Sequence, residues 1–326
     1  MAIIYGRSDA EIEILSRAPD SVENIEDIEP KGIELKNEFL YKKKDFFNNL
    51  PTKIKKEEEK LDEIKNDEKK TILKYDEKIK VLKEEKTKGG FSSFSASLKI
   101  GFAKHYSKRK EINKIKELEE KQKDQITLWK EKPDEIFNNS QRDTINEIKH
   151  FDRVRKDPML AGAKGEKLVL KKLSELSDDY HVFCGVRAEL PYTVRYDGKK
   201  NLRKAQLDFI VISKKGAVLI EVKNWSDKYV NSQSPWRAHE QVDKAGKVLW
   251  IVIKSRWSWW RGKNPPVKNV LLSIQGNLRY NPNYKFVSVC NLDSINDFIK
   301  NRKDELSDRG VRKLIGLFKD EVSDWD

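Results

Sequence analysis

Two acidic residues and a lysine lie beside two apolar runs between residues 206 and 223. Asp208 comes directly before Phe209–Ile212, and Glu221 comes directly after Val218–Ile220, with Lys223 two residues further on. Runs of this length, rich in Ile and Val and separated by a short break that contains glycine, predict a β-hairpin.

The predicted hairpin brings the three charged side chains to one face. An even loop, either Lys214–Lys215 or Ser213–Gly216, places Asp208 directly opposite Glu221. Directly opposed residues have Cβ atoms roughly 5 Å apart. Side chains alternate along a strand, so Lys223 shares the face of Glu221. An odd loop without a bulge would break this parity.

Two carboxylates and an ammonium in this arrangement predict metal-assisted phosphodiester hydrolysis. Like charges near a core repel and are costly to desolvate, and a divalent cation removes that conflict. Asp and Glu supply the hard oxygen ligands of Mg²⁺, which polarises a phosphate and lowers the pKa of a bound water. The lysine can orient that water or neutralise charge that develops on the phosphate. The alternative is a surface-edge hairpin with solvated charges, which the flanking apolar runs disfavour.

The same residues resemble the core of a nuclease superfamily. Asp208, followed after twelve residues by Glu221-Val222-Lys223, resembles the PD-(D/E)XK nucleases, and the fuller pattern resembles their nuclease-related domain, NERD. The resemblance covers about half of the protein. It includes Gly165-Glu166, Gln206-Leu207-Asp208, Ile220-Glu221-Val222-Lys223-Asn224-Trp225 and, more weakly, Ser234-Pro235 and the residues after it.

The resemblance implies an α/β fold with a PD-(D/E)XK-like mixed sheet flanked by helices. It implies that Asp208, Glu221 and the Val222 carbonyl hold Mg²⁺, for which Mn²⁺ can substitute. It also implies that Lys223 assists the attacking water and that Glu166 lies beside the metal. The family often has Gln three positions after Asn-Pro. Here Ala238 stands at that spacing after Ser234-Pro235, and the nearest glutamine, Gln241, has an open role.

The charge balance favours a polyanionic partner. The chain carries a net charge of +13, and its first 30 residues carry −6, which leaves +19 for the rest. This balance favours nucleic acid over a membrane surface, and we expect DNA. A secretory signal and an apolar run near 20 residues are both absent from the sequence, so we expect no membrane span and a cytoplasmic protein.

One basic stretch predicts the nucleic-acid surface. Residues 246–290 contain eight Lys or Arg and no Asp or Glu, and residues 255–263 interleave three tryptophans with three cations. Exposed cations would bind phosphates and an indole would stack on a base. Alternatively, the tryptophans cover the core while the cations face solvent. A basic loop at 195–204 is the second candidate. The residues predicted to contact nucleic acid are Arg256, Trp259, Arg261, Lys263, Arg203 and Lys204.

The N-terminal half predicts a helical arm. Residues 53–131 are rich in Lys and Glu, and Ile54, Leu61, Tyr75 and Leu82 share one heptad column that Glu68 interrupts. This pattern predicts two long helices, separated by Gly89-Gly90 and a Ser-rich turn, in an antiparallel hairpin or coiled coil. A single solvated helix is the alternative. The apolar link at 89–106 is interpreted as a tip packed on its own helices, or else as a docking or membrane-touching tip.

The predicted domains are a short helical N-terminal segment (1–52), the arm (53–131), a linker (132–157) and a NERD-like nuclease domain (158–326). We expect a hydrolase, a Mg²⁺-dependent nuclease that cleaves DNA and forms a homodimer through the arm. Such a protein would suit bacterial antiviral defence or DNA processing. The alternative is a non-catalytic scaffold that binds nucleic acid with a nuclease-like fold.

Overall fold

The computed structural model describes residues 1–87, 91–198, 200–232, 236–257 and 264–319. Two compact units result, one formed by residues 1–32 with 150–326 and the other by residues 33–149. Helices α2 (Ile28–Thr87) and α6 (Arg142–Arg155) each run from one unit into the other. This division differs from the predicted boundaries, because the first 32 residues contribute a strand and a helix to the nuclease-like unit.

The nuclease-like unit contains a mixed sheet, as the sequence predicts. Its strands, in spatial order, are β1 (Ile3–Tyr5), β2 (His181–Tyr196), β3 (Lys200–Ser213), β4 (Gly216–Lys223), β5 (Val267–Ser273) and β6 (Val287–Asn291). The β3 strand runs antiparallel to both of its neighbours, β2 and β4. The outer pairs, β1–β2, β4–β5 and β5–β6, are parallel. The sequence did not reveal β1, which is too short to show a period.

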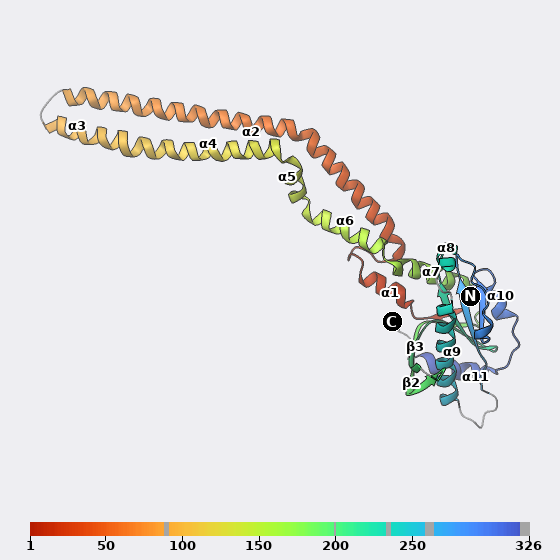
Figure 1. Ribbon diagram of the computed structural model, residues 1–326. Helices are drawn as coiled ribbons and strands as arrows, with labels where there is room; N and C mark the ends of the chain where they lie inside the picture. The colour runs from red at the N-terminus through yellow and green to blue at the C-terminus, as the bar shows by residue number, and fades with distance from the viewer. Residues whose placement is uncertain (88–90, 199, 233–235, 258–263, 320–326) are drawn as a thin grey trace. The chain divides into compact units, whose positions relative to one another are not determined.

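Helices cover both faces of the sheet. They are α1 (Asp9–Ser16), α7 (Pro158–Leu173), α8 (Asp227–Ser232), α9 (Trp236–Arg256), α10 (Ile295–Lys300) and α11 (Asp308–Phe318). On one face, Leu219 of β4 packs in a core with residues of α9 and α11, and α9 passes across the strands (Figure 1). On the other face, Ile220 packs with residues of α7 and α10. Burial on both faces explains why β4 is apolar almost throughout.

The central hairpin has the predicted even loop. Ser213 pairs with Gly216, so Lys214 and Lys215 form a two-residue connection. Gly216 has a φ of +96°, and a Cβ there would lie 2.4 Å from the carbonyl oxygen of Pro266. Only glycine fits this turn without displacing the chain. The register, extended one residue beyond the last pair, sets Asp208 opposite Glu221.

The basic segment at 195–204 is mostly strand, so the prediction of a loop there is wrong. Tyr196 pairs with Lys200 and Val194 with Leu202. The chain reverses at Asp197 and Gly198, which have φ values of 51° and 68°. Val194 and Leu202 pack against the core beneath α9. This burial continues the pairing of β2 with β3 through the charged residues.

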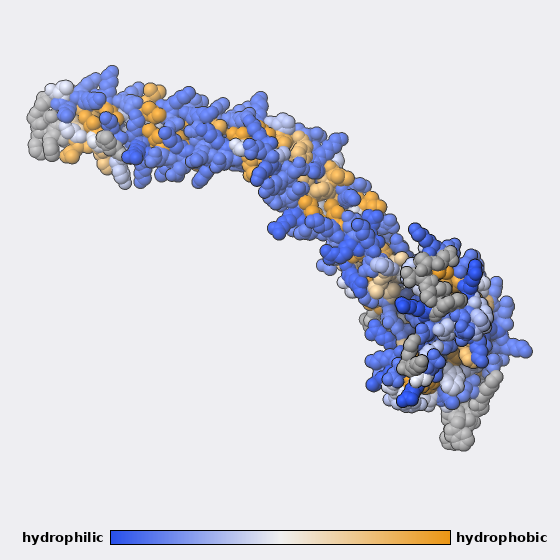
Figure 2. Space-filling view, viewed as in Figure 1, coloured by the Kyte–Doolittle hydropathy of each residue, from blue (hydrophilic) through white to orange (hydrophobic). Residues whose placement is uncertain are grey.

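The second unit contains an antiparallel helical hairpin, as predicted. The residues of α2 after Gly32 lie beside α3 (Phe91–Phe102), a π-helical turn (Ala103–Ser107) and α4 (Lys108–Glu131), with α5 (Pro133–Ser140) following (Figure 1). Gln122 donates to Glu57 at 2.6 Å, and Lys130 lies 2.6 Å from Glu58. Hydrophilic residues cover most of the face of this unit seen in Figure 2, with hydrophobic residues between them.

The apolar column of α2 faces the seam of this hairpin. Tyr75 and Ile79 are buried there. The predicted Ser-rich turn is wrong, because the chain is helical from Phe91 onward. Ala96 and Ala103 are buried, and these small side chains allow a close approach to α2. Among the helices in the described ranges, none is long and apolar enough to cross a membrane.

Candidate functional site

The hairpin strands β3 and β4 separate at Asp208. Residues that flank a two-residue loop form a hydrogen-bonded pair, and such pairs recur at every second position. In this hairpin the pairs are Ser213–Gly216, Val211–Val218 and Phe209–Ile220, and the pairing of β3 with β4 ends there. The next hydrogen-bonded pair would have included Val222. The Val222 N–H instead donates to Asp208 Oδ2 at 2.7 Å. Since the N–H and C=O of a strand residue point the same way, the Val222 carbonyl faces the same gap.

Glu221 contributes a buried carboxylate with one unsatisfied oxygen. The residue is 2% exposed, and its Oε1 accepts from Lys223 Nζ at 2.7 Å and from Gln241 Nε2 at 2.5 Å. Its Oε2 is buried and has no hydrogen-bond partner among the described residues. A buried unpaired carboxylate oxygen is costly and is a feature of ligand sites. The Gln241 contact gives this residue of α9 a place in the site that the sequence left open.

The Lys223 side chain lies between two partners. Its side chain is only 16% exposed, and its ammonium contacts Glu221 on one side. On the other side, Nζ lies 5.7 Å from the centre of the Trp225 ring, within range of a cation–π interaction. The aromatic residue after the strand therefore limits where the lysine can move.

Glu166 reaches the site because α7 packs closely on the ends of the strands. A Cβ at Gly165 would lie 2.9 Å from Cβ of Asn224, so glycine permits this approach. Asn224 Nδ2 in turn donates to the Ala161 carbonyl at 2.7 Å. Direct contacts therefore hold Gly165-Glu166 of α7 beside Asn224-Trp225, which follow β4.

Burial and neighbouring charges raise the pKa values of Asp208 and Glu166. Burial raises the pKa of Asp208 well above its usual value, and the charges of Glu221 and Glu166 raise it further. Burial, with the charges of Glu221 and Asp9, raises the pKa of Glu166 to about 7, although a hydrogen bond from Ser8 lowers it. Carboxylates in this arrangement therefore resist ionising together.

The sequence did not identify the N-terminal residues of the site. Ser8 is buried, donates its hydroxyl to Glu166 Oε2, and caps α1 by accepting from the Glu11 N–H at 3.2 Å. The Ser-x-x-Glu spacing predicts such a cap but not the contact 158 positions away. Gly185, with a φ of +59°, makes room for this segment, because a Cβ there would lie 2.9 Å from the Arg7 carbonyl oxygen.

The oxygen ligands present fit a hard divalent cation. Within the described part of the chain, no group of three or more His, Cys, Asp or Glu side chains could hold a metal ion. Two carboxylates and a backbone carbonyl remain at the strand separation, from Asp208, Glu221 and Val222. Carboxylate and carbonyl oxygens, completed by waters, are the coordination that Mg²⁺ prefers.

Three of the six predicted nucleic-acid contacts lie within the described residues, on α9 and β3. Arg256, the last residue of α9, donates to the Leu317 carbonyl at 3.3 Å. Arg203 and Lys204 are exposed on β3, 3.1 Å and 3.2 Å from the Glu189 carboxylate. The remaining predicted contacts, Trp259, Arg261 and Lys263, lie outside the described residues.

Together, the fold and site define an α/β domain whose central hairpin ends in a buried carboxylate–lysine site. Residues 161–272 match the family model of the nuclease-related domain, NERD, so this part of the chain is similar to that family. Comparisons with curated proteins and with solved structures gave no match. The matched range includes Glu166, Asp208, Glu221 and Lys223, whereas Ser8 lies outside it.

Replacing Asp208 with Asn should stabilise the metal-free protein at pH 8. The raised pKa of Asp208 means that folded-state stability falls as pH rises above the usual range of an aspartate. Asn removes this cost and can still accept from the Val222 N–H. We expect thermal unfolding in EDTA to shift up by about 2–4 °C, and Mg²⁺ to stabilise the wild type but not Asp208→Asn.

The control is Asp178→Asn, which neutralises an exposed aspartate outside the site. It should leave both the melting temperature in EDTA and the response to Mg²⁺ unchanged. A folded Asp208→Asn protein that melts no higher than wild type in EDTA, or that Mg²⁺ stabilises equally, would contradict the prediction.

Replacing Ser8 with Ala should raise the pKa of Glu166 above about 7, because the hydroxyl stabilises the ionised carboxylate. A hydrogen bond contributes about 1 kcal/mol, which corresponds to roughly 0.7 pH units. NMR titration of the Glu166 carboxyl carbon in metal-free protein measures the shift. Ser8→Thr retains the hydroxyl and should keep the wild-type value. Equal pKa values in wild type and Ser8→Ala would show that the contact has no electrostatic effect.

Proposed function

We propose that this protein is a metal-dependent nuclease that hydrolyses phosphodiester bonds, with DNA as its substrate. The supporting observation is the unpaired, buried Oε2 of Glu221 beside Asp208, at the point where β3 and β4 separate. A structural ion pair would satisfy both carboxylate oxygens, whereas a metal ligand needs one left available. The match to the nuclease-related domain agrees with a nuclease-like function.

In this proposal, Asp208, Glu221 and the Val222 carbonyl hold Mg²⁺, and Mn²⁺ can take its place. When bound, the ion supplies Lewis-acid polarisation of the phosphate and a lowered pKa for an attacking water. Neighbouring residues of the chain hold the two carboxylates in place. The 2.7 Å bond between Val222 and Asp208 fixes one carboxylate, and Gln241 fixes the other.

Lys223 and Glu166 have separate roles in the proposed reaction. The Lys223 ammonium, held between Glu221 and Trp225, orients the water or stabilises negative charge that develops on the phosphate. The pKa of Glu166, raised to about 7, lets its carboxyl group gain or lose a proton near neutral pH. Ser8 holds that carboxyl group in place.

A non-catalytic scaffold that only binds nucleic acid is the second candidate. Buried carboxylates facing a phosphate would weaken binding, so a purely binding surface gains nothing from Asp208, Glu221 and Glu166 together. The presence of all three carboxylates beside a lysine favours catalysis. A role in antiviral defence or DNA processing within the cytoplasm forms part of the same proposal, and the pairing of a nuclease-like unit with a long arm is its only support.

Asp208→Ala or Glu221→Ala should reduce cleavage at least about 100-fold, because each removes a proposed metal ligand. Binding to DNA should be kept or tightened, because negative charge facing the phosphates is removed. Lys223→Ala should slow cleavage and leave Mg²⁺ binding intact. Plasmid nicking with Mg²⁺, Mn²⁺ and EDTA, together with linear duplex, single-stranded DNA and RNA substrates, measures these effects.

The exposed Asp178→Ala serves as the matched control and should cleave like wild type. A double Asp208→Ala, Glu221→Ala variant with wild-type activity would rule out the proposed metal site. If wild type binds DNA but never cleaves it with either metal, the scaffold hypothesis replaces the nuclease.

We also propose that the arm forms a homodimer, as exposed Leu73, Val81 and Leu118 along it suggest. The two ends of the arm are adjacent, since a Cβ at Gly32 would lie 3.2 Å from Cβ of Phe151. A variant that joins Gly32 to His150 through a short Gly-Ser linker removes residues 33–149. We expect light scattering to show a dimer for the full chain and a folded monomer, by circular dichroism, for this variant. If the full chain and the variant were both monomers, the arm would have no role in assembly.

A further inference from the structure

The end of the helical hairpin combines exposed apolar side chains with a concentration of positive charge. Leu98, Phe102 and Tyr106 are 63%, 62% and 58% exposed. They recur every four residues, which places them along one side of the helix. The Phe102 and Tyr106 rings stack with centroids 5.2 Å apart. We call these three side chains the tip stripe.

A π-helical turn at Ala103–Ser107 keeps the tip stripe aligned. Steps of four residues drift around a regular α-helix, which has 3.6 residues per turn. The wider turn counteracts this drift between Phe102 and Tyr106, whose stacked rings show that they remain in line. Such single-turn π segments occur frequently at functional sites.

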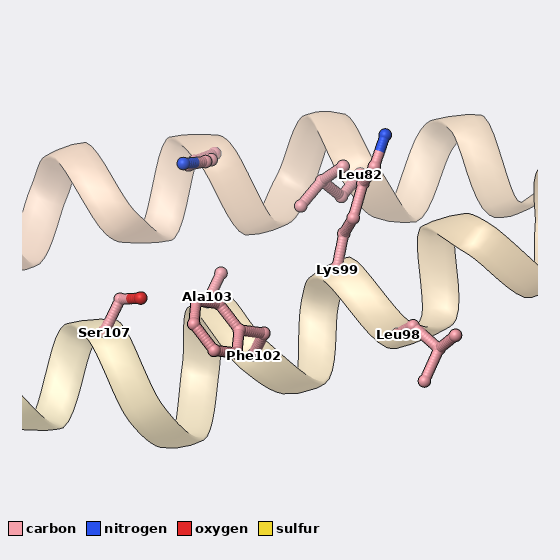
Figure 3. A pocket seen from close by; sticks show the side chains of 7 residues that line it. Leu82, Leu98, Lys99, Phe102, Ala103 and Ser107 are labelled. Atoms are coloured by element: carbon pink, nitrogen blue, oxygen red, sulfur yellow. The ribbon is translucent and has the colours of Figure 1, made fainter.

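The tip stripe faces outward beside an open hollow. A hollow of about 510 Å³ between the helices is lined by Lys78, Leu82, Leu98, Lys99, Phe102, Ala103 and Ser107. In Figure 3, Lys99 and Ala103 point toward α2, whereas Leu98 points away from it. Leu98, Phe102 and Tyr106 are each more than half exposed, so they are available to a partner even though Leu98 and Phe102 also border the hollow.

The segment of chain that carries the tip stripe contains only positive charge, whereas the neighbouring part of α2 includes Asp76, Glu77, Glu84 and Glu85. Between Lys86 and Lys110 there are seven Lys or Arg residues and no Asp or Glu. Lys108 pairs with Asp76 of α2, and Lys110 lies 5.9 Å from the Tyr106 ring. Other parts of the arm mix Lys and Glu, so this concentration of one sign is particular to its end.

We infer that this tip docks on an anionic phospholipid bilayer. Positive charge around an exposed aromatic and aliphatic stripe is the chemistry of helices that lie at a lipid interface. A second copy of the tip would bring seven further cations against the first seven, and repulsion disfavours it. Nucleic acid would match the charge but would leave the aliphatic Leu98 in water, whereas a bilayer accommodates both.

Flotation of the full chain with lipid vesicles tests the inference. We expect binding to vesicles in which about a third of the lipid is phosphatidylserine, and at least tenfold weaker binding to phosphatidylcholine alone. The variant Leu98→Ser, Phe102→Ser, Tyr106→Ser should lose binding to anionic vesicles. So should Lys99→Gln, Lys104→Gln, Arg109→Gln, which removes charge and leaves the stripe intact.

The matched control replaces three exposed apolar residues elsewhere in the same unit, Leu40→Ser, Tyr41→Ser, Leu128→Ser, and should bind vesicles like wild type. Circular dichroism verifies that each variant keeps its helix content. Absent flotation with anionic vesicles, or equal binding by the stripe variant, would overturn the inference. The inference would also fail if tip variants lost affinity for a DNA duplex while vesicle binding stayed unchanged, since the tip would then be a nucleic-acid contact. None of these outcomes depends on cleavage activity.

Discussion

The repulsion among the carboxylates of Asp208, Glu221 and Glu166 is the constraint on which the rest of the nuclease-like unit depends. Burial and mutual repulsion raise the pKa values of Asp208 and Glu166, so the fold must hold together groups that favour separation. The surrounding elements supply that restraint. The Val222 N–H fixes Asp208, and Lys223 with Gln241 fixes one oxygen of Glu221. The other oxygen stays available, and the proposed cation binding follows from this imbalance.

The N-terminal segment forms part of this restraint, although most of the chain separates it from the hairpin. The β1 strand extends the sheet in parallel beside β2, and Ser8 at the start of α1 donates to Glu166. Gly185 leaves the space in which the Arg7 carbonyl lies. The family match covers 161–272, so Ser8 lies outside the matched region. The arm is inserted between residues 32 and 150 of this unit.

Charge is distributed differently in the arm and in its tip. Along the shaft, Lys and Glu alternate and form pairs across the hairpin, such as Lys130 with Glu58, which contribute little individually at an exposed surface. Stability there comes from the seam, where Tyr75 and Ile79 are buried. At the tip the acids disappear and the apolar side chains turn outward. The shaft satisfies its own charges, whereas the tip has positive charge and apolar surface that its own helices do not use.

The sequence by itself determined the central hairpin and the helical arm. Two apolar runs on either side of a glycine turn have few competing structures, and the even loop set Asp208 against Glu221 without knowledge of the rest. The tertiary structure decided what local patterns do not encode. It showed that 195–204 continues the strands because Leu202 is buried, and that Gln241 contacts Glu221. It also brought Ser8 to Glu166, because long-range packing, and no sequence period, joins residues 158 positions apart.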